Sequence, residues 1–106
     1  MLDAAREAQA YTAGKARDEF DRDRLLQLGL TRLIEIIGEA AGQVSDEARQ
    51  RQPTIPWSKI VGMRNRLVHA YFAVNLDILW DTVTLELPVL ISQLETLLAE
   101  EAMPPS

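Results

Sequence analysis

The sequence contains no cysteine and only one histidine among its 106 residues, and its five glycines are scattered. Without cysteine, neither a disulfide framework nor a thiolate metal site can form, and a reducing compartment is expected. One histidine without a carboxylate partner at helical spacing excludes an ordinary zinc or two-metal site. The scattered glycines form no phosphate-binding loop. Any chemistry is therefore expected to proceed without a metal or a bound cofactor.

Targeting and membrane signals are also missing. The N-terminal residues, MLDAAREAQAYTAG, lack the basic start and apolar run of a signal peptide. No segment approaches the uninterrupted apolar length of a membrane span, so a cytoplasmic protein is expected. The length predicts one domain, residues 1–106, with a frayed tail over residues 100–106. A chain of this size leaves apolar surface for a partner to cover.

Alternating β-branched residues are missing too, and helical spacing dominates instead. Gly14 is expected to end a first helix that begins at Leu2, because glycine readily adopts the left-handed conformation past a helix end. Asn75 is a plausible N-cap for the last helix, and Pro88 should kink that helix because proline removes a backbone donor. The expected helices cover residues 2–13, about 25–44, 46–51, about 57–70, and from 76 onward.

Two long apolar stripes predict an all-α antiparallel helical bundle. Gly38 and Gly42 lie four residues apart, so another backbone could approach closely there. Packing within the chain and a homodimer both explain this pattern. The first stripe comprises Leu26, Leu30, Leu33, Ile37, Ala40 and Val44, widened by Leu25, Ile34 and Ala41. The second comprises Leu76, Trp80, Val83, Leu87, Leu90, Leu94 and Leu97.

The charge is unevenly distributed. The net charge of −5 argues against a nucleic-acid binder, because affinity for phosphates comes largely from lysine and arginine. From Ala48 to Leu76, however, the chain has five basic residues and no acidic one. This basic zone on an acidic body suits a binder that does not attach to every polyanion. Its cations are Arg49, Arg51, Lys59, Arg64 and Arg66.

The stretch IVGMRNRLVHAYF, residues 60–72, concentrates the polar chemistry of the chain. On a helix, Asn65 and His69 share a face, and Arg64 must swing its side chain around to reach the same point. A guanidinium can hold a phosphate with two hydrogen bonds, and an imidazole can move protons near neutral pH. Together they suffice to cleave RNA without a metal, with His69 as acid or base and Arg64 stabilising the charge that develops on the phosphate. Tyr71 follows just past the expected helix end.

Structural interpretations compete with these assignments. A single histidine at a helix end commonly binds the last carbonyls, which on spacing alone is the more frequent role. Arg66 and Lys59 are better explained as solvated surface than as RNA contacts.

Two further pairs have ordinary structural explanations. Trp57 and Trp80 are expected to pack in the core or an interface. Glu35 and Glu39 are typical of an exposed face, and become functionally interesting only if Arg64 comes near them.

The motif formed by Arg64, His69 and Tyr71 resembles the signature of the HEPN superfamily. The strings EIIGEAAGQVS, IPWSKIVGMRNRLVHAYF and LDILWDTV resemble its HepT-like toxin branch, over most of the chain from about Leu2 to Leu98. The resemblance implies an all-α bundle, a homodimer whose motifs face a shared cleft, and metal-independent ribonuclease activity. It also implies a partner, an MntA-like nucleotidyltransferase antitoxin that adds AMP to the motif tyrosine, here Tyr71.

Two functions follow as hypotheses. The first is an RNA-cleaving toxin of a toxin–antitoxin pair. The second is a non-catalytic helical module that binds nucleotide or serves as the docking subunit of the transferase. The presence of Arg64, Asn65, His69 and Tyr71 together favours the first, because a docking subunit does not need all four.

Overall fold

The computed structural model describes residues 1–69 and 73–102, with only the backbone of Val68, His69 and Ala73. Apart from one two-residue strand pair, every element in this part is a helix, which confirms the predicted all-α class. The elements are α1 (Leu2–Thr12), α2 (Arg17–Asp21), α3 (Arg24–Gly42), α4 (Asp46–Arg51), α5 (Trp57–Val61), α6 (Met63–Leu67), β1 (Val68–His69), β2 (Ala73–Val74), α7 (Leu76–Asp81), the π-helical segment η1 (Thr82–Glu86) and α8 (Leu87–Ala102).

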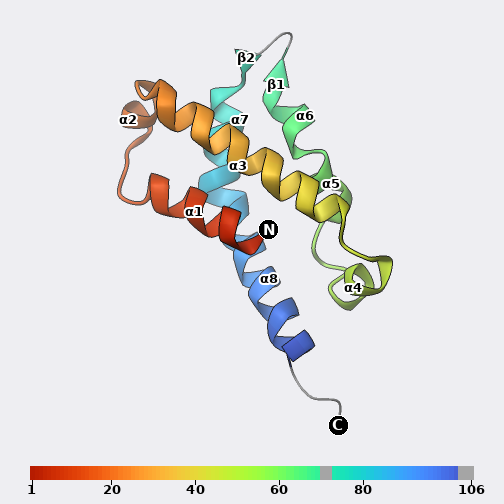
Figure 1. The fold of residues 1–106 in the computed structure, drawn as a ribbon. Coiled ribbons are helices and arrows are strands. Elements are labelled where there is room, and N and C mark those ends of the chain that lie inside the picture. The colour runs from red at the N-terminus through yellow and green to blue at the C-terminus, as the bar shows by residue number, and fades with distance from the viewer. Residues whose placement is uncertain (70–72, 103–106) are drawn as a thin grey trace.

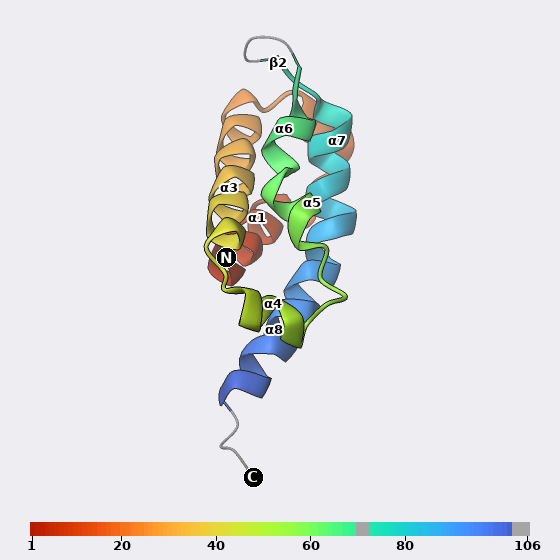
Figure 2. The same cartoon turned by 90° about the vertical axis from the view of Figure 1, so that its right-hand side faces the viewer.

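Helix α3 is the centre of an elongated bundle that measures 52 × 30 × 18 Å (Figure 1). It packs against α1 on one side and against α5 and α6 on the other. Helix α1 in turn contacts α8 and η1, and α6 contacts α7. Figure 2 shows α3 and the α5–α6 segment running side by side along the bundle. Residues 60–67, the helical part of the stretch IVGMRNRLVHAYF, therefore lie along α3.

The two predicted stripes supply ten of the 21 buried apolar residues in the described part of the chain. Both tryptophans pack as expected: Trp57 is buried, and the ring of Trp80 lies 5.1 Å from that of Phe20. From α3 the buried stripe residues are Leu30, Leu33, Ile34, Ile37 and Ala41, and from the C-terminal helical run they are Val83, Leu87, Leu90, Leu94 and Leu97.

The prediction for Leu25 is wrong, because its side chain is 80% exposed. In this first turn of α3 the inward position belongs to Gln27, which is buried. Its amide donates to the carbonyls of Phe20 and Asp21 at 3.0 and 3.2 Å. A buried amide with two partners avoids the cost of an unsatisfied polar group, and it ties α2 to α3.

Gly38 explains how α5 can approach α3 closely. A Cβ atom at this position would lie 3.3 Å from the carbonyl oxygen of Ile60 and 3.4 Å from that of Val61. The same atom at Gly42 would have nothing within 4 Å. Of the two interpretations of this glycine pair, packing within the chain therefore accounts for Gly38.

The predicted helix over residues 57–70 is wrong in two respects. It is interrupted at Gly62, and α6 ends at Leu67. Val68 then pairs with Val74 in an antiparallel ladder, and the amide of Asn75 donates to the carbonyl of Leu67 at 2.7 Å. β-Branched valines favour this extended pairing.

The ends of the other helices agree better with the sequence. Gly14 has a φ of +75°, two residues past the end of α1, as expected of a helix stop. The side chain of Asn75 accepts a hydrogen bond from the amide of Ile78 at 3.1 Å, which confirms the predicted N-cap. Pro88 is the second residue of α8, which directly follows the π-helical segment η1; the kink expected at Pro88 stays a prediction.

Of the residues 100–106 that the sequence predicts to be frayed, 100–102 belong to α8, which continues to Ala102. Gln52 donates to the Glu100 carboxylate at 3.2 Å, and Arg51 pairs with Glu101 at 3.3 Å. These contacts hold the helix end against α4. Residues 103–106 lie outside the described part.

By length and composition, the helical run from Leu76 to Ala102 is apolar enough to cross a membrane. Its stripe from Val83 to Leu97 is buried against the rest of the bundle. Core packing therefore explains this stripe, whereas Leu85, Val89 and Leu98 of the same run are exposed.

Candidate active site

Arg64 extends from α6 towards α3, where it meets Glu35. Its Nε donates to Glu35 Oε1 at 3.1 Å. Glu35 is the less exposed partner, with 25% of its side chain accessible against 60% for Arg64. The close approach of α5 at Gly38, one turn along α3 from Glu35, holds α6 near enough for this contact. Because Arg64 lies this close, Glu35 becomes a candidate functional residue.

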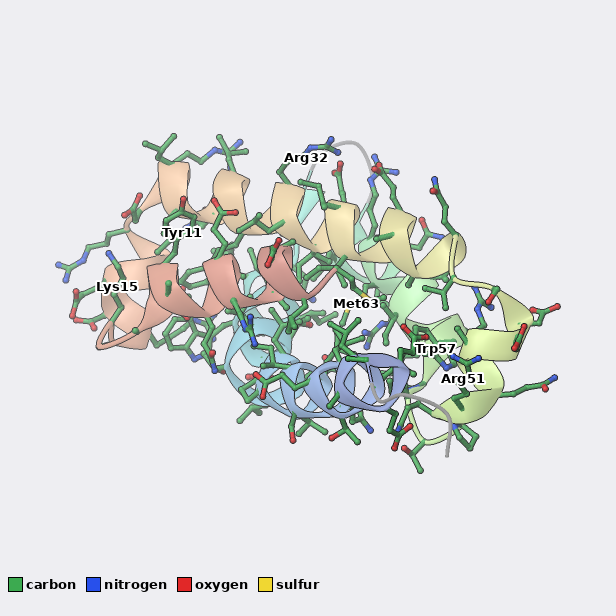
Figure 3. The ribbon with its side chains drawn as sticks, turned by 60° about the horizontal axis from the view of Figure 1, so that its bottom comes forward. Tyr11, Lys15, Arg32, Arg51, Trp57 and Met63 are labelled. Carbon is green, nitrogen blue, oxygen red and sulfur yellow. The ribbon has the colours of Figure 1, made fainter. Side chains whose placement is uncertain are left out.

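A second arginine binds the same carboxylate. Arg32 Nη1 lies 3.2 Å from Glu35 Oε2 and 3.6 Å from Glu39 Oε1. Figure 3 shows Arg32 at the outer edge of α3, away from Met63, which lies between the helices. Two guanidinium groups therefore alternate with two carboxylates, and the formal charges of this cluster of four cancel.

An open hollow lies beside this cluster. Its walls come from α3, α5 and α6, and both Arg64 and its chain neighbour Asn65 line it. Gly38 and Gly42 also line it. The lining residues are Glu35, Gly38, Glu39, Gly42, Val61, Arg64 and Asn65.

His69 and Tyr71 cannot be placed in this hollow from the described residues. The backbone of His69 lies in β1, paired with Ala73, so the predicted helical face shared by Asn65 and His69 does not form. The His69 side chain and all of Tyr71 lie outside the described residues. Figure 1 shows β1 directly beyond α6, the helix that carries Arg64, at one end of the bundle. The roles of both residues stay predictions.

Lys59 and Arg66 point away from Arg64. Lys59 Nζ lies 2.9 Å from Glu86 Oε1 on η1, and Arg66 Nη2 lies 3.7 Å from the same oxygen. Thr82 Oγ1 donates to the other oxygen of Glu86 at 3.0 Å. Burial opposes the charged form of Glu86, but the hydrogen bonds from Lys59 and Thr82 and the nearby cations prevail and lower its pKa. Any RNA contact by Lys59 or Arg66 would therefore form beside Glu86 on η1, and not beside Arg64.

In the folded chain, the five cations of the basic zone lie against groups that offset their positive charge. Arg49 donates to the carbonyl of Ala41 and lies 5.9 Å from the ring of Trp57. Each of the other four cations pairs with glutamate, mostly from a distant part of the sequence. The pairs are Arg51 with Glu47 and Glu101, Lys59 with Glu86, Arg64 with Glu35, and Arg66 with Glu86.

Larger hollows exist elsewhere on the bundle. One is lined by Lys59, Met63 and the exposed side chains of Leu85 and Val89, and is predominantly apolar. It does not include Arg64 or Asn65. Its size therefore does not make it the better site for phosphate chemistry, which requires converging polar groups.

Sequence reasoning missed Arg32 as a member of the site. The available signal was its position on the same face of α3 as Glu35 and Glu39, three and seven residues further on. This spacing relates Arg32 to the two glutamates on its own helix, but does not show that Arg64 from α6 completes the cluster.

Fold and site together define a small all-α bundle that presents an arginine–carboxylate cluster beside an open hollow. Residues 1–97 match the family described as Ribonuclease HepT-like. A relative from Caldanaerobacter subterraneus, named "Putative RNase TTE0752", is 39% identical over 88 residues, covering 83% of this chain and 79% of that protein. The chain belongs to the HepT-like ribonuclease family.

Two further relatives support this assignment. A "Probable ribonuclease HepT" from Thermococcus cleftensis is 35% identical over 89 residues, covering 84% of this chain and 81% of that protein. A "Putative RNase MJ1380" from Methanocaldococcus jannaschii is 30% identical over 95 residues, covering 90% and 87%. No solved structure matches the chain.

Proposed function

We propose that this protein is a metal-independent endoribonuclease and the toxin of a toxin–antitoxin pair. The observation that carries the proposal is the family match over residues 1–97, with Arg64 and Asn65 at one open hollow. The names of the three relatives support ribonuclease activity. We further propose that the protein acts in the cytoplasm, where its RNA substrate is found.

The proposed reaction is transesterification within the RNA strand. The ribose 2′-oxygen attacks the neighbouring phosphorus while the bond from phosphorus to the 5′-oxygen breaks. His69 accepts the proton of the 2′-hydroxyl or gives one to the leaving oxygen, since imidazole titrates near neutral pH. The products are a 2′,3′-cyclic phosphate and a free 5′-hydroxyl.

Arg64 is proposed to stabilise the negative charge that develops on the non-bridging oxygens. The guanidinium retains its charge at every relevant pH and can form two parallel hydrogen bonds to a phosphate. Its 60% exposure leaves it accessible to a strand that approaches the hollow. Asn65 is proposed to support substrate binding from the same wall.

We propose that the active form is a homodimer whose two motifs face a shared cleft. Each chain has one histidine, and transesterification benefits from both an acid and a base, which two chains supply. Large exposed apolar side chains are available for such an interface, among them Leu25, Leu28, Leu85 and Val89. Light scattering at micromolar concentration is expected to give twice the chain mass.

The proposed control is AMP transfer from an MntA-like nucleotidyltransferase antitoxin to Tyr71. The phenol oxygen would attack the α-phosphorus of ATP and release pyrophosphate. The attached phosphodiester would then compete with RNA for Arg64, through its bulk and its charge. This proposal rests on the family resemblance of the motif.

The decisive experiment is incubation of the purified protein with cellular RNA in excess chelator. Cleavage with cyclic phosphate ends is expected, and His69→Ala and Arg64→Ala are each expected to reduce it by roughly a hundredfold, the usual scale for a general acid–base or charge-stabilising group. Arg22→Ala is the matched control, because Arg22 pairs with Asp18 on the exposed surface of α2.

The outcomes separate the two candidate functions. If Arg64→Ala and His69→Ala cleave RNA as fast as the parent, these residues are not the site. If the parent binds the transferase but leaves RNA intact, the protein is the non-catalytic docking subunit instead.

A further inference from the structure

Glu35 holds two arginines at once, one with each carboxylate oxygen. Arg64 Nε donates to Oε1 at 3.1 Å, and Arg32 Nη1 lies 3.2 Å from Oε2. The Glu35 side chain is one-quarter exposed, whereas both arginines are 60% exposed. A partly buried anion thus anchors two cations that otherwise extend into solvent.

The pair between Glu35 and Arg64 is poorly suited to stabilising the fold. Exposed ion pairs contribute little to stability, because water screens them and two flexible side chains must be ordered. The close approach at Gly38 and the buried stripe of α3 already hold α5 and α6 in place. What the pair does provide is a fixed direction for the Arg64 side chain.

The atom of Arg64 that contacts Glu35 determines which of the other guanidinium nitrogens can bind a ligand. A guanidinium has five N–H groups, one on Nε and two on each Nη. Because Glu35 takes the Nε–H, the two terminal nitrogens are left to form a fork of the kind that binds phosphate with two hydrogen bonds. A carboxylate held from its other side by Arg32 is itself restrained from turning away.

We propose that Glu35 is the positioning residue for Arg64, orienting its guanidinium so that the terminal nitrogens meet the scissile phosphate of RNA. This inference rests on the proposed ribonuclease function. Glu35 does not touch substrate. Arg32 supports it by holding Oε2.

The position of Glu35 also has an electrostatic consequence. Its negative charge offsets the mutual repulsion of Arg32 and Arg64, which bind the same carboxylate. The cost is some repulsion of the incoming phosphate. If Glu35 assists cleavage, its positioning of Arg64 must outweigh this repulsion. A slower Glu35→Gln variant would show that positioning dominates, and a faster one would show that repulsion of the phosphate dominates.

The test compares Glu35→Gln with Glu95→Gln in single-turnover and steady-state cleavage. Glu95 lies on α8, outside the hollow, and its Oε1 lies 3.1 Å from Nη2 of the exposed Arg6. Glu35→Gln is expected to lower kcat about ten- to a hundredfold, the scale of a misplaced catalytic group, with a smaller change in KM. Glu95→Gln is expected to stay within about threefold of the parent, since pairs this exposed contribute little.

A double variant separates positioning from a structural role. In an Arg64→Ala background, Glu35→Gln is expected to have no further effect, because the residue through which Glu35 acts is gone. An equal loss in both backgrounds overturns the proposal, as does a Glu35→Gln protein that cleaves as fast as the parent or faster. Circular dichroism and thermal unfolding of each variant identify any loss of fold.

A second measurement does not depend on activity. In nitrogen-15 NMR spectra, the Arg64 Nε–H, assigned from its loss in Arg64→Ala, is expected to exchange slowly with water in the parent and in Glu95→Gln, but rapidly in Glu35→Gln. If the parent does not cleave RNA yet shows this pattern, the ribonuclease proposal fails while the orientation by Glu35 stands. Equal exchange in all three proteins overturns the positioning role itself.

Discussion

Replacing Gly38 with alanine tests how closely α5 lies against α3. The new Cβ would be 3.3 Å from the carbonyl oxygen of Ile60 and 3.4 Å from that of Val61. Both contacts are with backbone, which cannot rotate away as a flexible side chain can. To restore ordinary contact distances, α5 must shift by a few tenths of an ångström.

Two effects of opposite sign determine the outcome. Alanine inside a helix is more favourable than glycine by about 1 kcal/mol. Overpacking a close contact typically costs about 1–3 kcal/mol. The net change in the free energy of unfolding for Gly38→Ala is therefore expected between about zero and a loss of 2 kcal/mol.

Gly42→Ala is the matched control, because its Cβ would meet nothing within 4 Å. It gains helix propensity without a clash and should stabilise the protein by up to about 1 kcal/mol. Urea unfolding of the two variants measures the difference, expected at about 1–3 kcal/mol. RNA cleavage should fall only in Gly38→Ala, because Arg64 moves with α5 and α6. Equal stabilisation by both alanines would refute the close packing inferred at Gly38.

Three further predictions concern charge and control. The pKa of Glu86 is lowered in the folded protein, so its contribution to stability is present above its ordinary value of 4.5 and is lost as pH falls through the folded pKa. Unfolding midpoints measured from pH 7 to pH 3 should therefore fall less steeply for Glu86→Gln than for the parent; parallel profiles would contradict this. If the protein neutralises only about two phosphates, its RNA affinity should drop by roughly sevenfold between 50 and 200 mM salt, as measured by filter binding. A thousandfold drop over the same range would show a much larger basic surface. Co-expression with the cognate transferase should add AMP to the parent at Tyr71, detected by mass spectrometry, whereas Tyr71→Phe should stay unmodified there and active; modification at another residue would contradict the proposed route.

The sequence was sufficient for the features that depend on local periodicity. The stripe of α3 and that of the C-terminal helical run are buried as predicted, because three- and four-residue spacing places apolar side chains on one helical face. The N-cap at Asn75 and the stop at Gly14 were predictable for a similar reason. In each, a single residue type satisfies a local backbone requirement.

The errors occur where tertiary contacts override local preference. Nothing in the spacing of residues 57–70 shows that Val68 would leave the helix to pair with Val74, six residues further along the chain. Leu25 fits the apolar stripe by spacing, yet Gln27 takes the inward position because two carbonyls of the preceding segment are there to accept its hydrogen bonds. Such partners become visible only when the segments are assembled.

The charge distribution shows the same limitation and changes what is expected of substrate binding. In sequence, residues 48–76 form a basic zone without acids. In the folded chain, Glu35 from α3, Glu86 from η1 and Glu101 from α8 lie against its cations. A paired cation attracts a distant phosphate weakly, because the field of its partner largely cancels its own outside the immediate contact. If the protein binds RNA as proposed, affinity must then come from short-range contacts at the hollow, where the terminal nitrogens of Arg64 would bind phosphate, and from the second chain of the proposed homodimer. An acidic protein can therefore act on RNA without a large basic surface, provided that the few cations it presents are held in the correct orientation.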